Sequence, residues 1–286
     1  MKKLPWNKET QVSNLSDSLG KLNSILGSIF NQNLNSENLK HLLDIQSDAK
    51  LSELQKRGTN VFFNTLGEKQ GNIEEIISKS IKYLPPESPS STELPDRNWI
   101  LDFFDLCQNC SDTEIQEIWA KLLAYKVDNP NSHSRRLMHT IRMLEPNEAT
   151  TFNNMAKCVC EITIGSNIEG LDDFGSNFGT VWVAAESVLI DEEDFEFNIN
   201  YDTCLTLEEM GLLSNKEYDG ADNLLSEIAF LVDNEKVIYK LNEATISIFE
   251  FTKIGFELFE IANHELNQSY KGTIIQELEL ANMIKK

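Results

Sequence analysis

The stretch CSDTEIQEIWAKLLAYKVDNP, residues 110–130, carries the most definite pattern in the chain. Ser111 and Glu114 have the spacing of a capping box, in which each side chain accepts a bond from the other residue's backbone N–H. Apolar residues then recur at the spacing of a wide helical face: Ile115, Ile118, Trp119, Leu122 and Leu123. Asn129-Pro130 ends the pattern, because proline disfavours helix at the preceding residue. We predict a packed helix with Trp119 in the core. The polar residues are expected to point away from that face: Asp112, Gln116, Glu117 and Lys121.

Helical patterns continue on both sides of this stretch. Asp96 is a suitable cap for a helix with five apolar positions, at Trp99, Ile100, Phe103, Phe104 and Leu106. A further helix is expected at about 133–144, and Pro146 suits the first position of the next. Residues 97–165 therefore predict a central helical domain.

A proline-rich segment precedes that domain. LPPESPSSTELPD, residues 84–96, has four prolines and four Ser or Thr residues, a composition typical of a linker. Residues 1–83 predict a helical region with helices at about 12–30, 35–57 and 72–83. The first of these is amphipathic, with an apolar stripe of Leu15, Leu19, Leu22, Leu26, Ile29 and Phe30. It can pack on the chain's own core, on a partner or on a membrane, and its lack of a basic stripe favours the first two.

Charge separates the last part of the chain from the rest. The net charge is −21, and residues 166–286 carry 7 basic and 25 acidic side chains, a net charge of −18. Such a surface repels the phosphates of nucleic acids and attracts basic partners, although it can also serve solubility alone. The five cysteines and the absence of a secretory pattern after MKKLPW predict reduced thiols and a cytoplasmic location. No apolar run approaches the ~20 residues of a membrane span.

The composition after residue 165 indicates strands mixed with short helices. FGTVWVAAESVLI, residues 178–190, is rich in β-formers, and Gly211 is a natural left-handed helix end. Residues 236–241 and 244–251 alternate apolar and polar, which predicts a hairpin across Asn242-Glu243. Thr252 is expected to start a helix, and a last helix is expected at about 272–284. We therefore predict an α+β protein whose N-terminal and central regions are mainly helical and whose acidic domain, residues 166–286, holds a small antiparallel sheet.

Two groups of residues are candidates for ligand binding. Cys107-x-x-Cys110 and Cys158-x-Cys160 offer four thiols, but C-x-C is poor zinc spacing and free cysteines are commonly buried. We expect neither a metal nor a cofactor. The second group is a basic cluster of His133, Arg135, Arg136, His139 and Arg142. It can hold a phosphate, a nucleotide or an acidic partner, or it can pair internally with the acidic C-terminal part.

The signature Ser111-Asp112-x-Glu114-x-Gln116-x-x-Trp119-Ala120-x-x-Leu123-Ala124 resembles that of a bacterial family of unknown function. The similarity continues, more loosely, at Pro130, Ser134-Arg135-Arg136-Leu137, Leu144, Glu148-Ala149 and Phe152. This resemblance implies a link to mobile elements, phage defence or abortive infection. Residues 209–213 and 251–258 resemble the ending of winged-helix-like units, although their acidic surroundings disfavour DNA binding.

These features lead to one preferred function and two alternatives. We expect a non-enzymatic cytoplasmic interaction protein, acting in phage defence, with a protein partner or a second copy of itself as ligand. The first alternative is a nuclease or nucleotide-handling effector that uses the basic cluster. The second is a membrane-acting effector that uses residues 12–30.

Overall fold

The computed structural model describes residues 53–84, 94–132, 134–157, 159–165, 181–185, 199–219, 227–232, 235–240, 245–262 and 284–285, with Gly20, Leu22 and Ser24. The chain divides into two compact units, Met1–Met143 and Leu144–Lys286. The boundaries expected at 84–96 and at 165 do not coincide with this division. The helix expected at 12–30 lies outside the described residues apart from Gly20, Leu22 and Ser24, of which Leu22 is helical and 2% exposed while the other two are exposed. Residues 35–52 of the helix expected at 35–57 also lie outside the described part.

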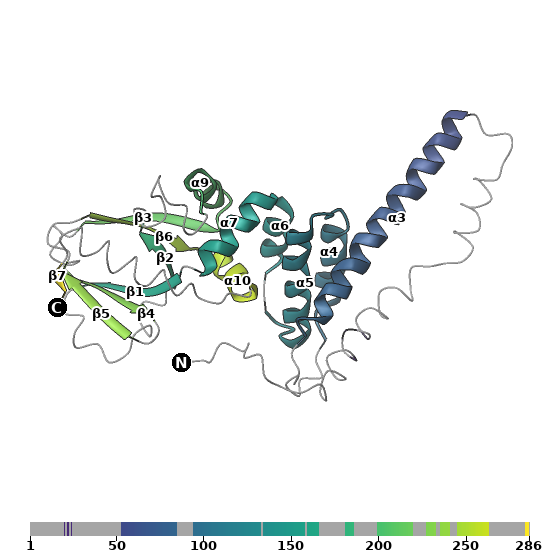
Figure 1. Cartoon of the computed structure of the whole chain (residues 1–286). Helices are drawn as coiled ribbons and strands as arrows, with labels where there is room; N and C mark the ends of the chain where they lie inside the picture. The colour runs from purple at the N-terminus through teal and green to yellow at the C-terminus, as the bar shows by residue number, and fades with distance from the viewer. Residues whose placement is uncertain are drawn as a thin grey trace. The chain divides into compact units, whose positions relative to one another are not determined.

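The first unit contains four described helices: α3 (Glu53–Ile81), α4 (Arg97–Cys107), α5 (Thr113–Asp128) and α6 (Arg135–Met143) (Figure 1). α5 packs against α3 and α6, and α4 also packs against α3 and α6. Its core contains side chains with no exposed surface, among them Phe103, Trp119, Leu122, Leu123, Leu137 and Ile141. The apolar face predicted for residues 115–123 is therefore the face that builds this core.

α3 is one helix of 29 residues, where separate helices at 35–57 and 72–83 were expected. Three glycines, Gly58, Gly67 and Gly71, weaken the helical pattern between the two segments. Packing of the last turns on α5 supplies a nucleus, and extending an existing helix is easier than starting one. The helix therefore continues through a segment whose own propensity is low.

The helix ends follow local chemistry, with one correction. Asp96 caps α4, as expected, by accepting a bond from Trp99 N at 2.9 Å. α5 is capped by Asp112 and not by Ser111, because the Asp112 carboxylate accepts from Glu114 N and Ile115 N, both at 3.0 Å. A carboxylate at this place also complements the positive end of the helix. The helix stops at Asn129, before Pro130.

The second unit has α7 (Pro146–Lys157), α9 (Tyr201–Glu209), α10 (Lys253–Ile261) and a seven-stranded sheet (Figure 1). The strands are β1 (Val159–Gly165), β2 (Val181–Ala185), β3 (Leu213–Asp219), β4 (Glu227–Val232), β5 (Glu235–Lys240), β6 (Thr245–Phe251) and β7 (Ile284–Lys285). Their order is β3-β6-β2-β1-β4-β5-β7, and every pair is antiparallel. The expected antiparallel sheet is present, and the winged-helix likeness is not confirmed.

The prediction of a hairpin between residues 236–241 and 244–251 is wrong. β5 pairs with β4, where Val232 lies opposite Glu235, and β6 pairs with β3 and β2. Only Asp233-Asn234 separates β4 from β5, and both residue types tolerate the left-handed backbone of tight hairpins better than Glu243 does. Residues 272–283 of the expected last helix lie outside the described part, while Ile284 belongs to β7.

The two segments that resemble a winged-helix ending meet in space. Gly211 has φ 75°, as expected for a left-handed helix end, and Thr252 caps α10 by accepting a bond from Gly255 N. The Thr252 hydroxyl donates to Gly211 O, and Thr252 N donates to Leu212 O at 3.1 Å. A Cβ on Gly255 would lie 1.9 Å from Leu212 O, so only glycine fits where the two segments cross.

Candidate functional site

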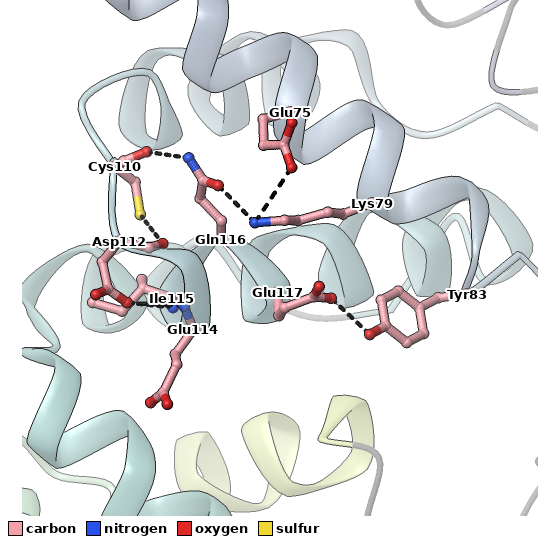
Figure 2. Close-up of polar contacts among 9 residues, drawn as sticks. All are labelled: Glu75, Lys79, Tyr83, Cys110, Asp112, Glu114, Ile115, Gln116 and Glu117. Carbon is pink, nitrogen blue, oxygen red and sulfur yellow. Dashed lines mark hydrogen bonds and ion pairs between the residues drawn. The ribbon is translucent and has the colours of Figure 1, made fainter.

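The polar side chains between α3 and α5 form two links (Figure 2). In the first, Lys79 Nζ donates to Gln116 Oε1 at 2.8 Å, and Gln116 Nε2 donates to Cys110 O at 2.9 Å. Lys79 is 6% exposed and Gln116 4%. We predicted that Gln116 points away from the packed face. This prediction is wrong, because α3 covers the Gln116 side chain.

The buried ammonium group of Lys79 explains why an amide side chain suits position 116. An ammonium group taken out of water needs acceptors, and the amide oxygen supplies one without a second charge. Glu75 Oε1 lies 3.7 Å from Lys79 Nζ, and its side chain is 58% exposed. The amide N–H of Gln116 in turn donates to Cys110 O, in the loop before α5. Each group binds another part of the same unit, so the arrangement holds α3 in register on α5.

The second link joins Tyr83 to Glu117. The Tyr83 hydroxyl donates to Glu117 Oε2 at 2.6 Å, and Lys121 Nζ lies 5.5 Å from the centroid of the Tyr83 ring. Burial, then the hydrogen bond to Glu117 and its negative charge, raise the pKa of Tyr83 to about 12. The phenol therefore stays protonated at neutral pH and acts as a hydrogen-bond donor. Sequence reasoning missed Tyr83, because it lies just past the end of α3 and outside its periodic pattern.

Trp119 lies in the core, as its apolar neighbours predict. It has no exposed surface, and its ring meets Phe103 edge-to-face with centroids 5.3 Å apart. Its indole Nε1 and that of Trp99 are buried and have no hydrogen-bond partner among the described residues. Packing in the core therefore accounts for the tryptophan at position 119, as we predicted.

Lys126 is a buried cation that the sequence did not reveal. It is 4% exposed, donates to Ser132 O, and its Nζ lies 4.7 Å from the centroid of the Trp99 ring. The ring face supplies negative charge to the ammonium group. This contact fixes the loop after α5 against α4. A lysine in the last turn of a helix is an ordinary surface pattern, so no sequence signal marks it.

The basic cluster divides into paired and exposed members. Arg135 Nε lies 3.2 Å from Asp102 Oδ2, and its Nη2 lies 3.5 Å from Asp96 Oδ1, so this arginine pairs within the first unit. The other described members are exposed on α6: Arg136, His139 and Arg142. His133 lies outside the described residues. In the part of the chain described, no ion pair joins Arg136, His139 or Arg142 to a carboxylate.

The described cysteines are poor nucleophiles. Burial raises the pKa of Cys107 and of Cys204 to about 12, and that of Cys110 to about 11. A thiol with such a pKa holds its proton at neutral pH, and the thiolate is the reactive form. Among the described residues, no three His, Cys, Asp or Glu side chains lie together as metal ligands. The side chains of Cys158 and Cys160 lie outside that part.

None of the helices described here has both the length and the apolar character needed to cross a membrane. The fold and the contacts define an α+β protein in which a helical unit, built around the tryptophan helix, precedes a unit with an antiparallel sheet. The chain belongs to a family of proteins of unknown function, DUF2806, whose model matches residues 56–275. No curated protein and no solved structure matches it. The matched range contains the signature helix, the basic cluster and strands β1 to β6.

Proposed function

We propose that this chain is a non-enzymatic interaction protein that acts in the cytoplasm in defence against phage. One observation carries the proposal: the first half of α3 exposes large apolar side chains. Val61 is 64% exposed, Phe62 49% and Leu66 44%. Figure 1 shows this half of the helix running away from α4 and α5. Grouped apolar surface of this kind marks interaction sites.

The polar groups between α3 and α5 support an interaction role over catalysis. Gln116, Lys79 and Tyr83 bind other parts of the first unit, and the described thiols hold their protons. Catalytic groups instead converge on a place that a substrate can reach. Among the described residues, the accessible surfaces include the apolar half of α3 and the basic face of α6.

The acidic end of the chain supports a basic partner. Residues 166–286 have a net charge of −18, and opposite charge on a partner speeds association and makes it dependent on salt. The defence role rests on the resemblance of the tryptophan-helix signature to a defence-associated bacterial family.

The test is a plaque assay combined with affinity purification of the full chain from its native host, with and without phage. We expect protection and a retained partner for the wild type, and loss of both for Leu66→Glu. Asn64→Glu is the matched control, because it adds the same charge at an exposed position on the opposite face of α3. Undiminished protection by Leu66→Glu would show that the exposed half of α3 has no part in the proposed function.

A second candidate function is the handling of an anionic ligand by α6. Its observation is the exposed set of Arg136, His139 and Arg142, spaced three residues apart on one short helix. Guanidinium groups bind phosphates strongly. Incubation with Mg²⁺, nucleic acids and nucleotides tests it: turnover or binding that is lost in Arg136→Ala and His139→Ala would replace the interaction role with this one.

A further inference from the structure

The outer side of α6 carries positive charge and no acidic residue. The buried side of this helix consists of Leu137, Met138, Thr140 and Ile141, and its exposed side consists of Arg135, Arg136, His139, Arg142 and Met143. At about 100° per residue, His139 lies at the centre of the exposed side, and Met143 lies between His139 and Arg136. Each of the other helices whose bounds are given above contains at least one acid, and the chain has a net charge of −21. Solubility alone therefore does not explain this surface.

Most of this exposed side has no internal partner. Arg135 pairs with two carboxylates at the edge of α4. Among the residues that the structure describes, the side chains of Arg136, His139 and Arg142 make no ion pair, and Met143 is 64% exposed. These four residues form the basic face of α6, in which cations surround an exposed apolar side chain.

We propose that the basic face of α6 binds a short acidic segment of a partner protein, with an aromatic side chain among its acids. This inference rests on the proposed interaction role, since it names the partner of a second surface of the chain. The two arginines bind carboxylates, because guanidinium forks match the geometry of these groups. Met143 contacts the aromatic ring, a pairing that the polarisable methionine sulfur favours.

The spacing of the arginines limits the length of the segment. Arg136 and Arg142 are six residues apart, which is about 9 Å along the helix axis. An extended peptide advances about 3.3 Å per residue, so the two arginines meet acids about three residues apart. The basic face of α6 therefore fits a segment of about four or five residues with acids at both ends and the aromatic residue between them.

Two observations favour a protein segment over a nucleic acid. The first is Met143, because methionine and arginine are both enriched in protein interfaces, whereas the phosphates of a polynucleotide make no use of an exposed apolar side chain. The second is the net charge of −21, which repels a polynucleotide wherever it extends beyond the basic face of α6. A short acidic segment ends before it meets that repulsion.

The experiment measures the fluorescence anisotropy of a labelled synthetic peptide, EEFDE, mixed with the full-length protein. We expect a Kd at or below about 1 mM at low salt. High salt should weaken this binding, because exposed charges are screened. The peptide EEADE, which has alanine in place of phenylalanine, should bind about threefold more weakly, since it lacks the contact with Met143.

Three variants of the full chain test the surface. Arg136→Glu should weaken the binding of EEFDE by at least about fivefold, whereas Arg57→Glu should leave it within about twofold of the wild type. Arg57→Glu is the matched control, because it makes the same charge reversal at an exposed position on α3. Met143→Gln should abolish the difference between EEFDE and EEADE. Circular dichroism should show the wild-type helix content for each variant, because all three positions are exposed.

Three results would overturn the proposal. The first is a wild type that does not bind EEFDE, and the second is binding that Arg136→Glu leaves unchanged or that does not distinguish EEFDE from EEADE. The third is tighter binding of a labelled thymidine oligonucleotide that Arg136→Glu weakens and Met143→Gln does not, which would assign the face to phosphates. If EEFDE fails to bind while Leu66→Glu still abolishes protection and partner retention, the proposed function stands and only this inference fails.

Discussion

The two halves of α3 share one helix and one apolar stripe, yet their surroundings differ. Residues 73–81 lie against α5, with Ile76 fully buried, and Lys79 and, just past the helix end, Tyr83 are bonded to α5 side chains. Residues 57–71 keep Phe62 49% exposed and Leu66 44%. The comparison teaches that periodicity identifies the face of a helix that prefers burial, whereas the neighbours in space decide whether it is buried.

The largest expected difference between the halves is in cavity formation. Ile76→Ala should lower the free energy of unfolding by about 2–5 kcal/mol, because it empties a fully buried site. Val61→Ala, in the exposed half, should change it by at most about 0.5 kcal/mol in the monomer. Urea unfolding at low protein concentration measures both. Equal losses for the two variants would show that the halves are not distinct.

The next effect concerns the buried link between Lys79 and Gln116. Gln116→Leu removes the amide that accepts from Lys79 Nζ at 2.8 Å, and should lower the free energy of unfolding by about 1–3 kcal/mol. Lys79→Met in the same chain should recover part of that loss, because it removes the buried charge left behind. A double-mutant cycle measures the coupling, and strictly additive losses would contradict the link.

Tyr83 offers a smaller effect with a pH signature. Tyr83→Phe removes the bond to Glu117 and should lower the free energy of unfolding by about 1 kcal/mol at neutral pH. The folded chain raises the pKa of Tyr83 from 10.0 to about 12, so its contribution is fully present below pH 10 and is lost as the pH rises through 12. Wild type and Tyr83→Phe should therefore converge in stability across that window. A difference that stays constant from pH 8 to 12 would argue against the bond.

The smallest expected effect is at Arg135, whose ion pairs with Asp96 and Asp102 lie on the surface of the first unit. Its side chain is 52% exposed, so Arg135→Ala should change the free energy of unfolding by about 0–1 kcal/mol. High salt should reduce the difference further. A loss as large as that for Ile76→Ala would mean that this surface pair contributes as much as the core.

Local chemistry made several features predictable. The caps at Asp96 and Thr252, the helix end at Asn129, the helix start at Pro146 and the left-handed Gly211 each follow from residues within about one helical turn. The burial of Trp119 follows from the spacing of its own helix. The cap of α5 was predicted one residue too early, since Ser111 and Asp112 are both good caps and only the path of the chain chooses between them.

The candidate site was less predictable. Gln116 lies in the signature, but it is buried by Lys79, 37 residues earlier in the chain. The pairing of Tyr83 with Glu117 spans 34 residues, across the proline-rich segment. The periodicity of one helix does not predict which polar residues of another helix its own polar side chains will contact. The basic cluster was visible as a composition, but only the structure separates the paired Arg135 from the exposed Arg136.

The sequence by itself determined the tryptophan helix, most helix ends and the α+β character, because backbone hydrogen bonds, caps and apolar periodicity act over a few residues. Only the tertiary structure decided the strand partners, the length of α3 and the burial of Gln116. Those features depend on contacts between segments far apart in the chain, where many pairings satisfy the same local preferences. The packing that satisfies all of them at once selects one pairing.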